Sequence, residues 1–394
     1  MGTTQGDFVA FLPFYIPKLK RVKIVIIGGG YAGMAALTAL TSYTKNLDIT
    51  VVDPREKHLK ITHLHETFRY PLSDLLVPFA NLATRFNFRH LQAKLSFDED
   101  LLQQWHKDKF VVINNEVVAF DYLLIASSGG DGAHEPIENV LSLPDFITSA
   151  GSDLLTEKCF KSTNTEEHSI SVVGGGATGI QFLFEIKQFL RRKKIKANLR
   201  LIHSGNQVLE QFPEGFGNHV QSRMRDLDIE FYPNTYFCGQ QENKLLLQKK
   251  KTKEHFELPS SLSLLFLGKK AANLFEVNAF GQLLIDQKPL GNIFVAGDCS
   301  HYNSLGSNSL SAQSAVRKGK LVARNILRHS SVIKLLEPYL HRELGYVVSL
   351  GHADAVGWLA AEGNVITGLP ALAIKEIVES QYDLLLQGID TYLI

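Results

Sequence analysis

The stretch KIVIIGGGYAG, residues 23–33, decides the fold of this chain. Its apolar run, Ile24–Ile27, is β-branched and has no polar alternation, which is typical of a strand buried on both faces of a parallel sheet. Glycines follow at Gly28, Gly30 and Gly33, and an alanine-rich helical pattern comes next. A strand, a glycine-rich turn and a helix in this order predict a unit that binds a nucleotide.

Each glycine of this first cluster has its own physical reason. Gly28 allows the tight turn, Gly30 lets the backbone approach a pyrophosphate, and Gly33 lets the helix pack closely on the strand. The helix start offers free N–H groups and a positive dipole end to phosphates. The next strand, Ile49–Val52, ends at Asp53, about 20 residues beyond the last glycine, where a carboxylate accepts hydrogen bonds from an adenosine ribose. The first candidate site also includes Tyr31, Ala32 and Pro54.

The same pattern recurs in the middle of the chain. A strand at Ser169–Val173 runs into a second glycine cluster, a helical stretch follows at Ile180–Leu190, and another strand, Asn198–Ile202, ends at His203. His203 can bond a ribose hydroxyl, or pair with a 2′-phosphate when protonated, so the sequence leaves NADH and NADPH open. A vestigial second site is the alternative. The candidate residues of this site are Gly174, Gly176, Ala177, Thr178, Gly179 and His203.

Two further strands end in residues that suit a bound ligand. The segment Phe120–Gly129 ends in small residues, where the backbone can lie against a ligand. The segment Gly291–Asp298 ends in Gly297 and Asp298, and the carboxylate can accept a hydrogen bond from a ribityl or ribose hydroxyl. The candidate residues of the first strand end are Ala126, Ser127, Ser128 and Gly129.

Composition narrows the class of protein and of partner. At about 100–200 residues per domain, the 394 residues suggest two or three domains. With 41 Lys and Arg against 40 Asp and Glu, the net charge of +1 argues against nucleic acid as the main partner. The three cysteines form no disulfide-type or metal-type motif, which is typical of a reduced intracellular protein. No apolar run approaches the length of about 20 residues that crosses a membrane.

Together these segments resemble the flavoproteins that carry two dinucleotide-binding domains. The resemblance rests on the two glycine clusters, the strand ending in Ala126–Gly129 and the late Ala296–Asp298, and it spans residues 22–330. In that superfamily the first unit binds FAD, the second binds NADH or NADPH, and the late aspartate meets the flavin side of FAD. The resemblance therefore implies those cofactors. It also implies an α/β fold with two Rossmann-like, glutathione-reductase-type domains and a small C-terminal α+β region.

Within this superfamily the chain looks similar to the type II NADH dehydrogenases and the apoptosis-inducing-factor-like quinone reductases. Ser311–Ala315 matches their AQxA-type helix start, and Leu344–Gly351 matches a segment of their small C-terminal sheet. The resemblance implies that Ala312 and Gln313 line a quinone pocket, with Gln313 against the flavin edge or the quinone. Glutathione-reductase-like and sulfide:quinone-reductase-like members carry redox cysteine pairs that this sequence lacks.

Two positions depart from that family. It usually has a glutamate two residues after the last glycine of the second cluster, and here the residue is Gln181. A glutamine there keeps a hydrogen bond to the nicotinamide region and loses the titration of a carboxyl group. The family's acidic residue for the NADH ribose is replaced by His203. Gln181 and Gln313 are therefore the candidate catalytic residues.

We expect four segments along the chain. They are an FAD-binding domain over 22–145, an NAD(P)H-binding domain over 146–288, a return to the FAD-binding domain over 289–330, and a C-terminal region over 331–394. In the last segment, apolar residues recur every three or four positions, which predicts one helical face. That face either packs on the body or docks on a membrane, with Glu376, Glu379 and Asp383 on the polar side.

The sequence thus predicts an FAD-dependent oxidoreductase that passes a hydride from NADH or NADPH to FAD and two electrons on to a quinone. Two alternatives stay open, namely the same fold with a soluble redox acceptor and a slow redox sensor that binds both cofactors. A cytoplasmic location is expected, and a peripheral contact on the inner face of the cell membrane and a homodimer are left open. No metal is expected, because His58, His63 and His65 lack the spacing of a convincing metal site.

Overall fold

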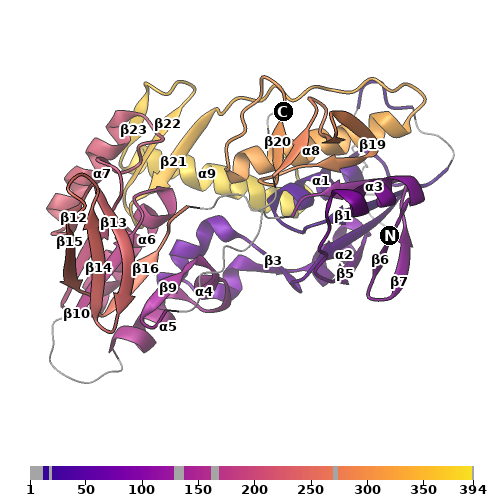
Figure 1. The fold of residues 1–394 in the computed structure, drawn as a ribbon. Helices are drawn as coiled ribbons and strands as arrows, with labels where there is room; N and C mark the ends of the chain where they lie inside the picture. The colour runs from indigo at the N-terminus through magenta and orange to yellow at the C-terminus, as the bar shows by residue number, and fades with distance from the viewer. Residues whose placement is uncertain (1–11, 17–19, 128–136, 161–167, 269–273, 393–394) are drawn as a thin grey trace, which may run out of the picture.

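Two sheets of mainly parallel strands, each built on one glycine cluster, form the frame of the computed structural model (Figure 1). The structure describes residues 12–16, 20–127, 137–160, 168–268 and 274–392. The fold is of the predicted α/β class, and a small three-stranded sheet and a long helix lie near its C-terminus.

The first sheet has the strand order β20-β17-β18-β19-β8-β1-β2-β5. Strand β1 (Val22–Ile27) lies parallel to β2 (Leu47–Asp53) and to β8 (Tyr122–Ile125), and β19 (Lys288–Val295) lies parallel to β8. Their carboxyl ends therefore meet at one edge, which is where open α/β sheets bind ligands. The other strands of this sheet are β5 (Arg89–Gln92), β17 (Phe275–Val277), β18 (Gln282–Ile285) and β20 (Ser300–Tyr302).

Both faces of β1 are buried, as the unbroken apolar run predicts. Ile24 and Ile26 belong to the core beneath α1 (Tyr31–Tyr43) and α8 (Ala312–Ser330). Val25 and Ile27 belong to the core on the opposite face. That face is covered by α3 (Glu99–Asp108) and by the hairpin of β6 (Phe110–Ile113) and β7 (Glu116–Ala119).

Helices α1 and α8 pack closely, because small residues face one another where they cross. A Cβ atom on Gly319 of α8 would lie 2.2 Å from the carbonyl oxygen of Ala32 in α1. No side chain larger than hydrogen therefore fits at Gly319. This packing brings the start of α8 to the sheet edge that carries the first glycine cluster.

The second sheet has the order β12-β11-β10-β16-β9, and its strands are parallel. Helices α6 (Ala177–Lys193) and α7 (Glu214–Asp226) pack on it. Its strands are β9 (Val140–Ser142), β10 (His168–Val173), β11 (Ala197–Ile202), β12 (Glu230–Tyr232) and β16 (Leu262–Leu265). An antiparallel sheet of β13 (Thr235–Gln241), β14 (Lys244–Lys249) and β15 (His255–Pro259) lies beside it.

Near the expected domain boundaries, three strands belong to a different sheet from the one that their place in the sequence predicts. Strand β9 lies in the first expected segment, yet it pairs with β16 of the second sheet. Strands β17 and β18 lie in the second expected segment, yet they belong to the first sheet. We therefore propose that the second unit runs over 140–265 and that the first unit resumes at 275, with the C-terminal region over 331–394 as expected.

The segment that follows β2 reaches from the first unit into the second. It contains β3 (Lys57–Leu59), the 3-10 helices η1 (Ile61–Phe68) and η2 (Leu72–Leu75), β4 (Leu76–Pro78) and α2 (Phe79–Phe86). Leu64 and Phe68 of η1 share one buried cluster with Phe182 of α6 and with Val348 of the C-terminal sheet. The remaining short helices are α4 (Leu143–Thr148), α5 (Gly151–Leu155) and η3 (Thr156–Phe160).

The C-terminal region contributes a sheet and the long helix α9 (Leu369–Leu386). The sheet has the order β21-β22-β23, with β21 (Gly345–Ser349), β22 (Ala355–Leu359) and β23 (Val365–Thr367). Figure 1 shows α9 in yellow, running from this sheet toward α1 of the first unit. Among the described residues, none of the helices has the length and hydropathy needed to span a membrane.

Helix α9 buries a more polar face than its apolar spacing predicts. Tyr382 is buried as expected, but Val378 is 40% exposed while Lys375 is only 5% exposed. Glu379, which was expected on the polar side of the helix, faces ion-pair partners in the protein and not open solvent. Its side chain is 18% exposed and pairs with Lys375 at 2.6 Å, and Lys375 also pairs with Glu66 of η1 at 3.0 Å. Ion pairs to η1 therefore set the buried face.

Candidate nucleotide sites

The first glycine loop joins β1 to α1, and contacts inside the protein leave no room for a side chain at three of its four glycines, including Gly29, where a Cβ atom would lie 2.3 Å from the Phe79 ring. Gly28 has a φ of +108°, and a Cβ atom there would lie 2.3 Å from the carbonyl oxygen of Ala126. A Cβ atom on Gly33 would lie 1.9 Å from the carbonyl oxygen of Gly28. A Cβ atom on Gly30 would meet nothing within 4 Å. Gly30 is thus the point at which the loop is open to a ligand.

The second glycine loop, between β10 and α6, repeats this geometry. Gly174 has a φ of +114°, and a Cβ atom there would lie 2.2 Å from the carbonyl oxygen of Phe266. A Cβ atom on Gly179 would lie 1.9 Å from the carbonyl oxygen of Gly174, whereas one on Gly176 would have its nearest neighbour at 4.0 Å. Each loop therefore offers an open backbone position at a helix start, which fits the pyrophosphate of a dinucleotide.

The residues that end β2 and follow β11 take the same place in their units. The backbone N–H of Gly29 donates to Asp53 Oδ2 at 2.8 Å, and the backbone N–H of Gly175 donates to His203 Nδ1 at 3.1 Å. In both units, the side chain at the strand end holds the middle of the glycine loop. The sequence did not indicate this role, because it depends on a contact between residues far apart in the chain.

Asp53 is also paired with Arg55, a residue that the sequence reasoning missed. Arg55 donates to Oδ1 through Nε and to Oδ2 through Nη2, each at 2.9 Å. Burial opposes ionisation of Asp53, but the hydrogen bonds and charge of Arg55 outweigh it and hold its pKa below the ordinary value. The Asp53 side chain is 3% exposed and that of Arg55 is 40% exposed. The surface that this strand end offers a ligand is therefore largely Arg55.

His203 is a neutral imidazole at physiological pH. Its Nδ1 accepts the hydrogen bond of Gly175, so the ring proton lies on Nε2. Burial lowers the pKa of His203, which keeps the charged form unfavourable. Two charged groups lie nearby: Lys250 donates from Nζ to the carbonyl oxygen of Ser204 at 3.2 Å, and the Glu210 carboxylate accepts from the N–H of Asn206 at 2.8 Å. The sequence offered no signal that the lysine-rich hairpin reaches this strand end.

The backbone that follows β8 and β19 lies against the first glycine loop and the start of α1. Ala126 and Ser127 follow β8, and both contact the position of a Cβ atom on Gly28. Gly297 follows β19 with a φ of +86°, and a Cβ atom there would lie 3.0 Å from Ala32 Cβ. Pro54 follows β2, and its carbonyl oxygen accepts from Gln92 Nε2 at 3.0 Å. Ser128 and Gly129 lie outside the described residues.

Lys318 of α8 places a buried cation beside Asp298. Its Nζ donates to the carbonyl oxygen of Ser300 at 3.0 Å, and its side chain is almost fully buried. Burial lowers the pKa of Lys318 to about 8, against the attraction of Asp298. Sequence reasoning passed over Lys318, because its position on the inner face of α8 follows from packing.

The start of α8 brings Ala312 and Gln313 to the same sheet edge. Ser311 caps the helix, and its hydroxyl accepts from the N–H of Ser314 at 3.0 Å. Ala312 and Gln313 are therefore the first two residues of the helix, where free N–H groups point outward. Further along α8, Gly319 packs on Ala32 at the start of α1.

Gln181 links three parts of the chain. Its Nε2 donates to Ser349 Oγ of β21 at 3.3 Å, and Ser349 Oγ lies 3.0 Å from His65 Nε2 of η1. Burial lowers the pKa of His65 to about 3, so this imidazole is neutral. The side chain of Gln181, the fifth residue of α6, is thus held by Ser349 of the C-terminal sheet, which in turn bonds His65 of the first unit.

Ligand atoms of His63, Glu66 and Glu379 lie within 4.8 Å of one another, a spacing that could hold a metal ion. The ammonium group of Lys375 lies among them, at 3.0 Å from Glu66 Oε1 and 2.6 Å from Glu379 Oε2. Burial lowers the pKa of Lys375, but the two carboxylates outweigh it and raise that pKa above the ordinary value. The lysine therefore supplies the positive charge that the two carboxylates need.

Two nucleotide loops and a returning third segment define an oxidoreductase that binds two dinucleotides. The chain belongs to the pyridine nucleotide-disulphide oxidoreductase family, whose model matches residues 22–319.

The curated relatives confirm the resemblance to the type II NADH dehydrogenases. The type II NADH:quinone oxidoreductase of Staphylococcus aureus is 27% identical, with 92% of this chain and 95% of that protein covered. The fold is similar to that of NDH2 from Plasmodium falciparum, solved in complex with NADH, at a TM-score of 0.72, 16% identity and coverage of 92% and 94%. It is equally similar to the sulfide:quinone oxidoreductase of Aquifex aeolicus, at a TM-score of 0.72, 18% identity and coverage of 94% and 93%.

Proposed function

We propose that this chain is an FAD-dependent oxidoreductase that uses NADH as its electron donor and a quinone as its acceptor. The observation that carries the proposal is the matched geometry of the two glycine loops, which are open at Gly30 and at Gly176. The nearly full-length similarity to type II NADH:quinone oxidoreductases supports the same reaction. Bound FAD supplies the chemistry, because flavin takes up a hydride from NADH and gives two electrons to the quinone.

In this proposal, the residues of the protein bind and orient FAD and NADH. The loop around Gly30 holds the FAD pyrophosphate, and the loop around Gly176 holds that of NADH. Asp53 and Arg55 lie at the adenosine end of FAD, and Asp298 lies at its ribityl end. Lys318 places positive charge beside Asp298, where it would favour a negative charge on a bound flavin. Gln181 lies at the nicotinamide end of the second loop and Gln313 at the quinone side.

The charge at the end of β11 favours NADH over NADPH. A 2′-phosphate needs cationic partners, and His203 is neutral. The Glu210 carboxylate adds a negative charge to the same strand end. The 2′-phosphate of NADPH would need Lys250 as a partner, and Lys250 would then have to leave its hydrogen bond to the carbonyl oxygen of Ser204.

We expect kcat/KM for NADH to exceed that for NADPH by on the order of tenfold or more, which corresponds to about 1.4 kcal/mol. The measurement is the steady-state oxidation of each donor by the FAD-loaded protein with a short-chain quinone. Replacing Lys250 with alanine should leave the NADH value unchanged. A preference for NADPH that disappears in the Lys250→Ala variant would instead make Lys250 a ligand of the 2′-phosphate.

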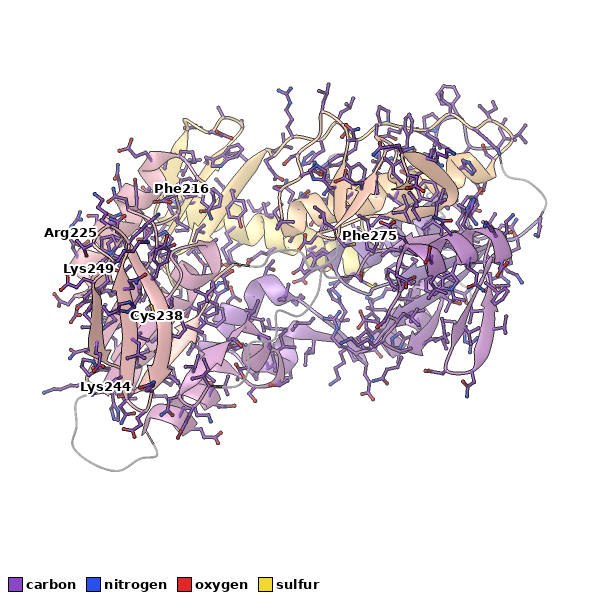
Figure 2. All side chains as sticks on the ribbon, in the orientation of Figure 1. Phe216, Arg225, Cys238, Lys244, Lys249 and Phe275 are labelled. Atoms are coloured by element: carbon purple, nitrogen blue, oxygen red, sulfur yellow. The ribbon has the colours of Figure 1, made fainter. Side chains whose placement is uncertain are left out.

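The described cysteines favour a quinone over a disulfide acceptor. Burial raises the pKa of the Cys299 thiol to about 12, so it holds its proton and does not act as a thiolate. Cys238 is exposed on β13, and Figure 2 shows it on the outer sheet of the second unit, away from Phe275 of the first unit. The alternatives are a soluble redox acceptor and a slow redox sensor, and the rate with the quinone separates them from the proposal.

We also propose a peripheral membrane contact next to the quinone side of the first site. Two chain segments present exposed leucines there: Leu305 and Leu310 are 81% and 56% exposed, and Leu340 and Leu344 are 57% and 48% exposed. The N–H of Ser307 donates to the carbonyl oxygen of His341 at 2.8 Å, which ties the segments together just before α8. Exposed apolar side chains at this position would bring a lipid-dissolved quinone to the start of α8.

Replacing Leu305 and Leu310 with serine should lower binding to vesicles of mixed phosphatidylglycerol and phosphatidylcholine by on the order of 100-fold or more, since each leucine contributes about 1.5–3 kcal/mol when fully buried. Co-sedimentation with the vesicles measures this binding. The matched control is the exposed pair Ile377 and Val378 of α9, also replaced with serine. Equal losses in the two double variants, or no binding by the unchanged protein, would count against the contact.

A further inference from the structure

We propose that α9 holds the first glycine loop in its FAD-binding shape through Tyr382 and His58, which makes both of them positioning residues for FAD. The inference rests on the proposed function only in that the first loop takes FAD. Three consecutive contacts carry it. They run from the loop backbone to a histidine, from the histidine to a tyrosine of α9, and from that tyrosine to the first residue of α1.

The first contact fixes the backbone of Gly29. His58 Nδ1 lies 2.8 Å from the carbonyl oxygen of Gly29, and a carbonyl oxygen only accepts, so Nδ1 carries the ring proton. The N–H of Gly29 is already held by Asp53 at 2.8 Å. Both polar groups of Gly29 are therefore bonded to buried side chains.

This contact also sets the direction of the next N–H group. The carbonyl group of Gly29 and the N–H group of Gly30 belong to one trans peptide unit and point in opposite directions. His58 pulls the carbonyl toward the protein interior, so the N–H of Gly30 is turned to the other side. Gly30 is the loop position with open space around it, and a free N–H there is what a pyrophosphate needs.

The second contact passes from His58 to α9. Burial lowers the pKa of His58 to about 4, so the ring is neutral and Nε2 has a lone pair. Tyr382 OH lies 3.0 Å from His58 Nε2 and must be the donor. His58 has no exposed surface and Tyr382 is 4% exposed, so no water competes for this bond.

The third contact joins α9 to the start of α1. The rings of Tyr382 and Tyr31 are stacked at a centroid distance of 4.1 Å and an interplanar angle of 19°. Tyr31 is the first residue of α1, directly after Gly30. Its hydroxyl bonds Thr62 Oγ1 at 2.8 Å, which holds the ring against α9. Tyr382 thus supports both neighbours of Gly30: Gly29 through His58, and Tyr31 by direct stacking.

Ion pairs on the same face of α9 keep Tyr382 in register. Lys375, which precedes Tyr382 by about two turns of α9, pairs with Glu66 at 3.0 Å. Asp383, the residue after Tyr382, lies 3.1 Å from Lys60 Nζ. Residues at these spacings lie on one face of a helix, and three of their partners, Glu66, Lys60 and His58, come from the segment that follows β2. This face of α9 therefore packs on the first unit. A truncation of the helix would remove its support from the first glycine loop.

The direct test replaces Tyr382 with phenylalanine and measures FAD binding to the apoprotein by calorimetry, together with the rate of flavin release on dilution. Phenylalanine keeps the stack on Tyr31 and removes the hydroxyl. We expect FAD to bind about three- to tenfold more weakly and to leave faster, because His58 Nε2 loses its donor. The matched control is Tyr122→Phe, which removes a tyrosine–histidine hydrogen bond of 2.9 Å to His329, within the same unit but away from the loop.

The outcomes separate this inference from the proposed function. FAD binding that is unchanged in Tyr382→Phe, or weakened equally in Tyr122→Phe, would overturn the role of α9. Failure of the unchanged protein to bind FAD would overturn the proposed function instead. A double variant with His58→Gln gives a third readout: the two changes should be less than additive in FAD affinity if they break one connection, and additive effects would contradict it.

Discussion

Replacing Gly30 with valine will abolish FAD binding while the protein stays folded. Gly30 has φ −80° and ψ −166°, an extended conformation that valine favours, and its Cβ position is open. The folded state therefore loses only a preferred helix-cap residue, at a cost of about 1 kcal/mol. The valine side chain fills the space that a pyrophosphate needs, so FAD affinity should fall on the order of 100-fold or more, about 2.7 kcal/mol.

The matched variant is Gly176→Val in the second loop, where φ is −78°, ψ is 177° and the Cβ position is equally open. This variant should keep its FAD and lose reduction by NADH. Flavin absorbance after gel filtration measures the first property, and flavin bleaching by NADH measures the second. If both variants lost FAD, or if Gly30→Val kept it, the assignment of one cofactor to each loop would be wrong.

Replacing Arg69 with methionine will cost about 3–5 kcal/mol of stability, the largest effect we expect from a residue outside the loops. Arg69 lies at the end of η1 and pairs with Glu185 of α6 at 3.0 Å and 3.1 Å. The Glu185 side chain has no exposed surface, and burial already raises its pKa above the ordinary value. Without Arg69, a buried carboxyl group must lose its charge or stay unpaired. Urea unfolding followed by circular dichroism measures the loss.

The control for this prediction is the double variant Arg69→Met, Glu185→Leu. An apolar pair in place of a buried ion pair is usually neutral or stabilising, so the double variant should recover most of the stability. A double variant as unstable as Arg69→Met alone would show that Arg69 acts through its other neighbours, of which Glu66 lies at 3.5 Å.

Local patterns in the sequence were enough to predict the two glycine loops. A glycine is required at Gly33 by a contact with Gly28 in the same loop, and the spacing of Gly28, Gly30 and Gly33 repeats wherever this unit occurs. The buried strand could be predicted for a similar reason, because residues with no polar alternation must have both faces covered. The order of strand, turn and helix then determines which strand ends meet at one edge.

Contacts between distant segments could not be predicted in the same way. The apolar spacing of α9 pointed to a face that includes Val378, but ion pairs with η1 turn Lys375 inward. Arg55 and Lys250 looked like ordinary surface cations, and only folding brings them to the ends of β2 and β11. Strand β9 pairs with the second sheet and β17 with the first, and no local sequence pattern indicates which sheet a short strand joins.

The measurement that tests the central claim most directly is an anaerobic titration of the FAD-loaded protein, followed by flavin absorbance. The account predicts that one equivalent of NADH bleaches the flavin band and that a short-chain quinone restores it rapidly. It also predicts that Gly176→Val, with its flavin in place, fails to bleach at the same NADH concentration. A flavin that NADH does not bleach in the unchanged protein, or one that a quinone does not reoxidise, would contradict the account.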